Sequence, residues 1–331
     1  MKKSALVLST IPVGLIGLSE VMLSIIFKGI GDSTEGNNEE FPPFIRKLEK
    51  GEGNLAALLR MLSMFNEVDS GPLPKAIAEC EKMEREEMSF VNSNGVTVYG
   101  TLYKAEKPTD TCVFFSHGYN MTGLTDGARY ICEYYNMGYD VFAPDHQNQG
   151  RSKGGWITFG EQESEDCLKW IDILNEKLGT PKMFVHGISM GCATACLMSD
   201  KLPSNVKFIV ADCGFTDAIS EFNHVITAFH ISKGIAKAVV NYLSKYYTLR
   251  TGYHLKNTDA KAILANSKVP VLFIHGDDDI FVPHTMGIEN YEACGSEKEI
   301  HIFPNVPHSG SYFFFRDEFL DCVQSFIKKY L

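Results

Sequence analysis

The sequence has no excess of basic residues. Its 331 residues include 31 Lys and Arg against 41 Asp and Glu, which gives a formal net charge of −10 at pH 7. A protein that neutralises nucleic-acid phosphates needs a basic patch, and we find none in this pattern. The acidic clusters at 81–87 and 161–166 are interpreted as solvated helix faces or helix starts. We therefore expect no nucleic-acid partner.

Paired cysteine motifs are also absent. The nine cysteines are scattered, none lies in a Cys-x-x-Cys pattern, and no Cys/His spacing suits zinc. Most of them lie in apolar runs, which favours buried free thiols and a reducing compartment. We expect no metal and no cofactor.

A long apolar run lies at the N-terminus. Residues 5–27 follow Lys2 and Lys3, are long enough to span a bilayer as a helix, and show no small-x-small cleavage site. We therefore expect residues 1–28 to be an uncleaved membrane anchor with its basic end inside. Because Glu20 is costly in hydrocarbon, an interfacial helix or a helix packed on the protein itself is the alternative. The cysteines favour a cytoplasmic location instead, so the side of the membrane stays open.

The segment 29–88 is predicted to precede the main domain. Residues 29–40 are rich in Gly, Ser, Asn and acids, as in a linker, and residues 41–88 show helical periodicity with a turn at 71–74. The chain contains no internal repeat and no low-complexity tract. The first 88 residues therefore point to no chemistry of their own.

From residue 89 onward, strand patterns alternate with helix patterns. An Asn-Gly turn at 94–95 predicts a hairpin. Further strands are expected at 112–115, 140–143, 183–185, 208–211, 269–274 and 299–303, and helices at 123–137, 161–178, 190–201, 257–266, 284–294 and 312–330. This alternation is typical of an α/β fold whose mostly parallel sheet is covered by helices on both faces, with its active site beyond the carboxyl ends of the strands. We expect one catalytic domain over 89–331, with a small helical cap inserted at about 214–260.

The pentapeptide Gly187-Ile188-Ser189-Met190-Gly191 lies between a predicted strand and a predicted helix. Flanking glycines allow a sharp turn that exposes a serine hydroxyl, and the next helix directs its N-terminus at that hydroxyl. Ser189 is therefore a candidate nucleophile.

Another strand is followed by His117-Gly118-Tyr119. The glycine lets the N–H of Tyr119 turn inward, where it and the N–H of Met190 are predicted to form an oxyanion hole. A plain strand-to-loop turn is the alternative. The loop at 145–152 is interpreted as structural, fixed by Gly150 and Arg151.

The last two strands also end in polar residues. Three aspartates occupy 277–279, where one carboxylate can orient a histidine; turn residues or a weak cation site are the alternatives. His308 follows on a loop with small neighbours, where its ring can turn toward a serine. The order Ser, Asp, His is the one that distinguishes α/β-hydrolases from other triad enzymes.

With these motifs in place, residues 89–331 resemble an α/β-hydrolase-fold serine hydrolase of the S33-peptidase-like group, which includes many bacterial esterases. The resemblance implies Ser189 as nucleophile, His308 as base and Asp279 as orienting acid, because Asp279 occupies the Asp of His-Gly-x-x-Asp-x-x-Val-Pro. The chain departs from many relatives at Gln147, Gln149 and Pro307, none of which is a triad position.

These residues predict acyl transfer on a small-molecule substrate, namely cleavage of a carboxylic ester by a serine esterase. The apolar residues in 214–260 and the N-terminal run favour an acyl-lipid ester. A serine aminopeptidase or amidase of the same fold is one alternative. A catalytically silent, membrane-tethered binding protein is the alternative from another class. The oligomeric state is left open.

Overall fold

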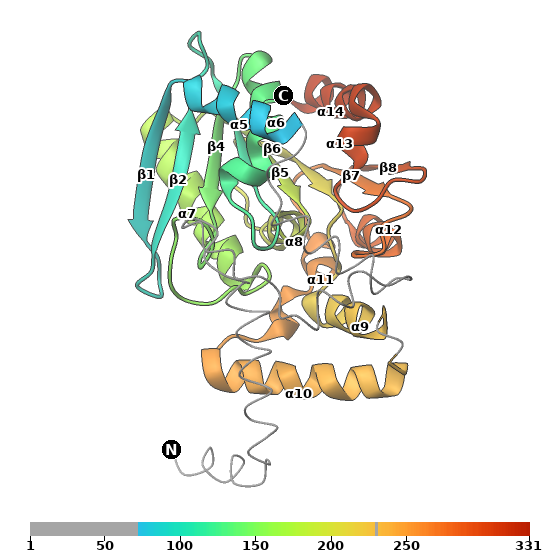
Figure 1. Ribbon diagram of the computed structural model, residues 1–331. Coiled ribbons are helices and arrows are strands. Elements are labelled where there is room, and N and C mark those ends of the chain that lie inside the picture. The colour runs from blue at the N-terminus through green and yellow to red at the C-terminus, as the bar shows by residue number, and fades with distance from the viewer. Residues whose placement is uncertain (1–71, 229–230) are drawn as a thin grey trace.

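The computed structural model describes residues 72–228 and 231–331 (Figure 1). The expected anchor at 1–28 and most of the segment 29–88 lie outside these residues. Within the described part of the chain, no helix is both long enough and apolar enough to cross a membrane.

An eight-stranded sheet forms the centre of the described domain, in the order β1-β2-β4-β3-β5-β6-β7-β8. β1 and β2 form an antiparallel hairpin, β2 pairs antiparallel with β4, and all other neighbours are parallel. The strands are β1 (Arg85–Val91), β2 (Thr97–Tyr103), β3 (Thr111–Ser116), β4 (Asp140–Asp145), β5 (Lys182–Ile188), β6 (Val206–Asp212), β7 (Val271–Gly276) and β8 (Lys298–Phe303). The mostly parallel sheet predicted from the sequence is thus confirmed.

Helices cover both faces of this sheet (Figure 1). They are α5 (Pro72–Lys82), α6 (Gly123–Asn136), α7 (Glu161–Leu178), α8 (Met190–Leu197), α11 (Ala260–Leu264), α12 (His284–Ala293), α13 (Ser311–Phe314) and α14 (Arg316–Tyr330). Trp170 of α7, Cys196 of α8 and Leu264 of α11 belong to the core on one face. Tyr134 of α6 and Phe326 of α14 belong to the core on the other. Burial of the sheet from both sides explains why its central strands are continuous apolar runs.

Several boundaries differ from the expectation. β1 begins at Arg85, ahead of the boundary at 89, because its charged side chains lie on an exposed edge strand and hide the strand pattern. α5 begins at Pro72, where a turn was expected; the missing N–H of proline is not needed in the first turn of a helix. The helix expected at 312–330 is divided at Phe315.

The segment between β6 and β7 forms the expected helical cap. It contains α9 (Ala218–Ala228), α10 (Lys233–Thr251) and the short 3₁₀ helix η1 (Leu255–Thr258). Figure 1 shows α9 beyond the ends of the central strands and α10 farther out, on the side of α9 away from the sheet. A hydrogen bond between His224 Nε2 and the Ile280 carbonyl, 2.9 Å long, ties α9 to the loop that follows β7. The cap is therefore fixed over the loop that carries Asp279.

Candidate active site

Ser189 occupies the sharp turn between β5 and α8. Its backbone has φ 54° and ψ −119°, a conformation that L-residues rarely adopt. Its N–H donates to the carbonyl of Asp212 at the end of the neighbouring β6, at 2.9 Å. The turn directs the hydroxyl away from the sheet and toward the loops at the carboxyl ends of the strands.

The glycines around Ser189 are required by close backbone approach. A Cβ on Gly191 would overlap the carbonyl groups of Ser116 and His117, and a Cβ on Gly187 would overlap the carbonyl of Gly191. These are backbone atoms within the sheet and its elbow, so they cannot move aside cheaply.

Gly191→Ala is expected to lower the free energy of unfolding by about 3 kcal/mol, because overpacking a fixed backbone strains it. Urea denaturation followed by circular dichroism measures the change. Gly234→Ala in α10 is the matched control, since a Cβ there meets nothing within 4 Å; it should be neutral or stabilise by up to about 1 kcal/mol. Equal stability of Gly191→Ala and the parent protein would contradict the close approach.

The structure brings Ser189, His308 and Asp279 into one hydrogen-bonded chain. His308 Nε2 lies 2.9 Å from Ser189 Oγ, and His308 Nδ1 lies 2.6 Å from Asp279 Oδ2. The other oxygen of Asp279 accepts the N–H groups of Phe281 and Val282 at 3.0 and 2.9 Å. The carboxylate is thereby fixed in the orientation that a histidine on the next loop requires.

The electrostatics of this chain follow from its burial. Burial by itself would raise the pKa of Asp279, but the charge of His308 and the hydrogen bonds from His275 and His308 outweigh it and hold that pKa below its usual value. Burial likewise opposes the charged form of His308, yet the Asp279 carboxylate raises the pKa of the imidazole well above 6.5. Each group therefore stabilises the charged form of the other.

The strand-end loop His117-Gly118-Tyr119 lies directly over Ser189. A Cβ built on Gly118 would lie 3.4 Å from Ser189 Cβ. The N–H of Gly118 donates to Asp126 Oδ2 at 2.7 Å, and the ring of His117 contacts the Gly118 carbonyl at 2.7 Å. Met190 is the first residue of α8, next to Ser189. The two backbone N–H groups predicted for an oxyanion hole thus belong to the two segments that flank the serine hydroxyl.

The loop after β4 supports this arrangement from behind. Asp145 accepts the N–H of Gly123 and both the N–H and Nε of Arg151, at 2.7 to 3.1 Å. Gln149 Oε1 accepts the N–H of Asn120 at 2.6 Å, beside Tyr119. Gln149 therefore helps to hold the loop that carries Tyr119.

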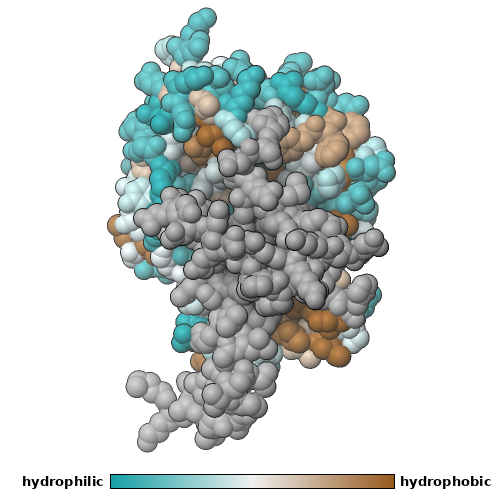
Figure 2. Space-filling view, in the orientation of Figure 1, coloured by the Kyte–Doolittle hydropathy of each residue, from teal (hydrophilic) through white to brown (hydrophobic). Residues whose placement is uncertain are grey.

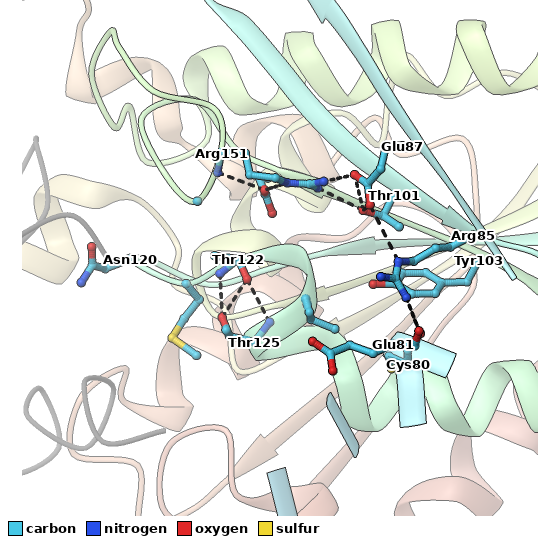
Figure 3. A pocket seen from close by; sticks show the side chains of 14 residues that line it. Cys80, Glu81, Arg85, Glu87, Thr101, Tyr103, Asn120, Thr122, Thr125 and Arg151 are labelled. Carbon is cyan, nitrogen blue, oxygen red and sulfur yellow. Dashed lines mark hydrogen bonds and ion pairs between the residues drawn. The ribbon is translucent and has the colours of Figure 1, made fainter. Parts of the chain in front are cut away.

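A cavity of about 310 Å³ lies behind this loop, and none of Ser189, Asp279 and His308 lines it. Figure 3 shows Arg151 directed at Glu87 and Thr101, and Arg85 directed at the backbone of Glu81. The cavity is therefore separate from the site around Ser189. It is formed by α5, the β1–β2 hairpin and the loops that follow β3 and β4.

Sequence reasoning missed several residues around Ser189, His308 and Asp279. His275 Nε2 lies 3.1 Å from Asp279 Oδ2 and supports the acid from the strand side. The Sγ of Cys213, the Asp279 carboxylate and the His308 ring offer donor atoms within 4.8 Å of one another, close enough for one metal ion to bind all three. Asp279 and His308 are already hydrogen-bonded to each other, and His308 also to Ser189, so such a site would compete with Ser189 for His308. The proximity of Cys213 to His308 can be seen only in the three-dimensional structure, because the two residues are far apart in the sequence.

Glu221 of α9 is the other missed residue. It is buried, and neither carboxylate oxygen has a hydrogen-bond partner among the described residues. Burial, together with the negative charge of Asp279, raises its pKa well above the usual 4.5. A raised carboxyl pKa means that folding disfavours the charged form, so Glu221 destabilises the fold increasingly as pH rises above 4.5.

Glu221→Gln is therefore expected to raise the melting temperature by several degrees at about pH 8 and to change it little at about pH 4. A thermal-shift series across this pH range measures the difference. The exposed Glu165→Gln serves as control and should show no such trend. If the melting temperature of Glu221→Gln differed from that of the parent by the same amount at every pH, a charged Glu221 carboxylate would not be the cause of the difference.

Comparison with known proteins agrees with this fold. A family model described as the alpha/beta hydrolase fold matches residues 113–231. The chain is 27% identical to the uncharacterized protein YqkD of Bacillus subtilis, over 75% of this chain and 80% of that protein. It is 24% identical to Protein bem46 of Schizosaccharomyces pombe, over 72% of this chain and 74% of that protein.

Solved structures show the same architecture. A Pyrococcus furiosus esterase superposes with a TM-score of 0.60 at 20% identity, covering 79% of this chain and 96% of the esterase. A thermostable carboxyl esterase from Bacillus coagulans gives a TM-score of 0.57 at 16% identity, covering 75% and 99%. The chain therefore has the α/β-hydrolase fold that its motifs predict.

Proposed function

We propose that the protein is a serine hydrolase that cleaves carboxylic esters through an acyl-enzyme. The observation that carries this proposal is the hydrogen-bonded chain from Ser189 Oγ through His308 to Asp279. A serine hydroxyl is a weak nucleophile unless a base removes its proton, and a histidine oriented by a buried carboxylate is such a base. The esterase structures with the same fold support this class of chemistry.

The reaction proceeds in two halves. His308 Nε2 takes the proton of Ser189 Oγ as that oxygen bonds to the carbonyl carbon of the ester. The carbonyl oxygen becomes an oxyanion and is stabilised by the N–H groups of Tyr119 and Met190. The imidazolium then gives its proton to the leaving alcohol oxygen, and the C–O bond breaks. Water enters, loses a proton to His308 and releases the acid from Ser189 by the same steps.

The surroundings of Ser189 favour an apolar acyl group. Met190 of the elbow, Phe215 at the start of the cap and Val282 of the acid loop belong to one buried apolar cluster. Phe222 of α9 packs edge-to-face on Phe159, 4.9 Å between ring centroids. An acyl chain entering between the cap and the elbow would therefore meet aliphatic and aromatic side chains.

A series of p-nitrophenyl esters of increasing acyl length, assayed beside aminoacyl p-nitroanilides, tests the proposal. We expect hydrolysis of the esters, with kcat/KM rising with acyl length over the shorter members, and little cleavage of the anilides. Cleavage of the anilides without any ester hydrolysis would favour an aminopeptidase. Failure to hydrolyse either class would favour the silent binding protein.

A further inference from the structure

α10, the outer helix of the cap, carries positive charge only. Residues 222–258 contain five basic residues and no Asp or Glu, in a chain whose net charge is −10. On α10 itself, Lys233, Lys237 and Lys245 are exposed, and none of the three pairs with a carboxylate of the described part of the chain. The acidic surface of the domain thus has a basic element at the tip of its cap.

The same helix is apolar on two sides. Ala236, Val240, Leu243 and Tyr247 are buried beneath it, on the side that packs against the cap and the domain. On the outward side, Ile235 is 59% exposed and Leu249 is 47% exposed, and Ile231 just before the helix is 37% exposed. Ile235, Ala238, Tyr242, Lys245 and Leu249 follow one another at intervals of three and four, which places them along one line of the helix. Figure 2 shows hydrophobic surface at the lower right, where α10 begins.

We propose that this outward face of α10, defined by Ile231, Ile235, Leu249 and Lys245 and flanked on one side by Lys233 and Lys237, docks the cap on a membrane surface that contains anionic lipid. Large aliphatic side chains with lysines along their flank are what an interfacial helix needs. The aliphatic groups enter the acyl boundary, and the lysines extend along their stems to the phosphates. With 19 residues, α10 is about 28 Å long and is the outermost of the described elements on this side of the domain (Figure 1).

The positive charge of this face favours an anionic membrane over a second copy of the chain as its partner. A second copy of the chain would bring the same lysines against these lysines, which is unfavourable in a two-fold contact. An anionic bilayer instead attracts all three, and each lysine near such a surface increases binding roughly fivefold. This docking is peripheral, so it needs no membrane-spanning helix. Because the cap lies over Ser189, it would also bring the site close to lipid; that consequence alone depends on the proposed function.

Vesicle flotation with the full chain tests the docking. We expect the protein to float with vesicles of phosphatidylcholine mixed with phosphatidylglycerol and to be released by high salt. The variant Lys233→Gln/Lys237→Gln/Lys245→Gln should bind about a hundredfold more weakly, and Ile235→Ser/Leu249→Ser at least about tenfold more weakly. Matched controls remove exposed lysines and apolar residues elsewhere. They are Lys107→Gln/Lys169→Gln/Lys201→Gln and Val91→Ser/Phe314→Ser, and both should bind like the parent protein.

Hydrogen exchange locates the contact independently. Peptides covering 233–251 should be protected by the mixed vesicles and not by phosphatidylcholine alone. The α10 variants should keep the melting temperature of the parent, because their side chains are exposed.

Three results would overturn the proposal. One is binding of both α10 variants at parental affinity, with protection confined to the apolar run at 5–27. Another is equal binding to neutral and anionic vesicles. The third is a dimer in sedimentation velocity that α10 substitutions dissociate while vesicle binding is unchanged, which would assign the face to a second copy.

Discussion

Ser189→Ala is expected to abolish both ester hydrolysis and covalent labelling by a fluorophosphonate probe. Loss of a triad serine typically lowers kcat by roughly 10⁴- to 10⁶-fold, and the remaining activity comes from the oxyanion hole and substrate binding. The physical reason is that Ser189 Oγ is the atom that His308 Nε2 contacts at 2.9 Å, and alanine offers no atom to be acylated. Stopped assays with p-nitrophenyl esters and in-gel probe fluorescence measure the two effects.

Ser199→Ala provides the matched control for this variant. Ser199 is also buried, and its hydroxyl has no hydrogen-bond partner among the described residues, so its removal should leave labelling and hydrolysis unchanged. Labelling of Ser189→Ala at the parental rate would mean that another residue is the nucleophile. Parental hydrolysis with the labelling lost would mean that the reaction does not pass through an acyl-enzyme at Ser189.

Asp279→Asn is expected to lower kcat/KM by roughly 10⁴-fold near neutral pH, because an amide favours the wrong histidine tautomer and does not stabilise the imidazolium. The variant should also change the pH profile. His308 acts as a base only when neutral, so activity rises with pH as His308 loses its proton. Because the Asp279 carboxylate raises the pKa of His308 above 6.5, the acid limb of the parent should have its midpoint above that value. In Asp279→Asn the midpoint should move to lower pH.

Asp277→Asn and Asp278→Asn are the controls that the sequence itself supplies. Asp277 accepts the N–H of Asn305 on the neighbouring loop. The carboxylate that His308 contacts is that of Asp279, not that of Asp277 or Asp278. Both variants should keep activity within about tenfold and leave the acid limb in place. A large loss in either of them, with Asp279→Asn active, would transfer the role of the acid to that residue.

Much of the fold could be predicted from the sequence, because apolar runs that indicate strands and terminal residues that indicate helices are local patterns. Continuous apolar runs such as Cys112 to Phe115 on β3 predict strands buried on both sides. The agreement at α7, expected at 161–178, reflects a helix with acidic residues in its first turn and a glycine at its C-terminal cap. β1 was underestimated because an edge strand has no buried face to impose alternation along its whole length. The break comes at Phe315, whose backbone leaves the helical conformation with φ −135° and ψ 49°, and the periodicity of the sequence does not express it.

The sequence by itself determined which residues are brought to the carboxyl edge of the sheet. A nucleophile-type turn at Ser189, a histidine at 308 and aspartates at 277–279 each follow a strand, and parallel strands end at one edge. The tertiary structure decided the rest. It placed Asp279 Oδ2 2.6 Å from His308 Nδ1, and it placed Cys213, Glu221 and His275 around these two side chains. It also left the basic face of α10 outward. The reason is that distance between side chains, burial and charge coupling depend on how separate elements pack, and no spacing along the chain encodes them.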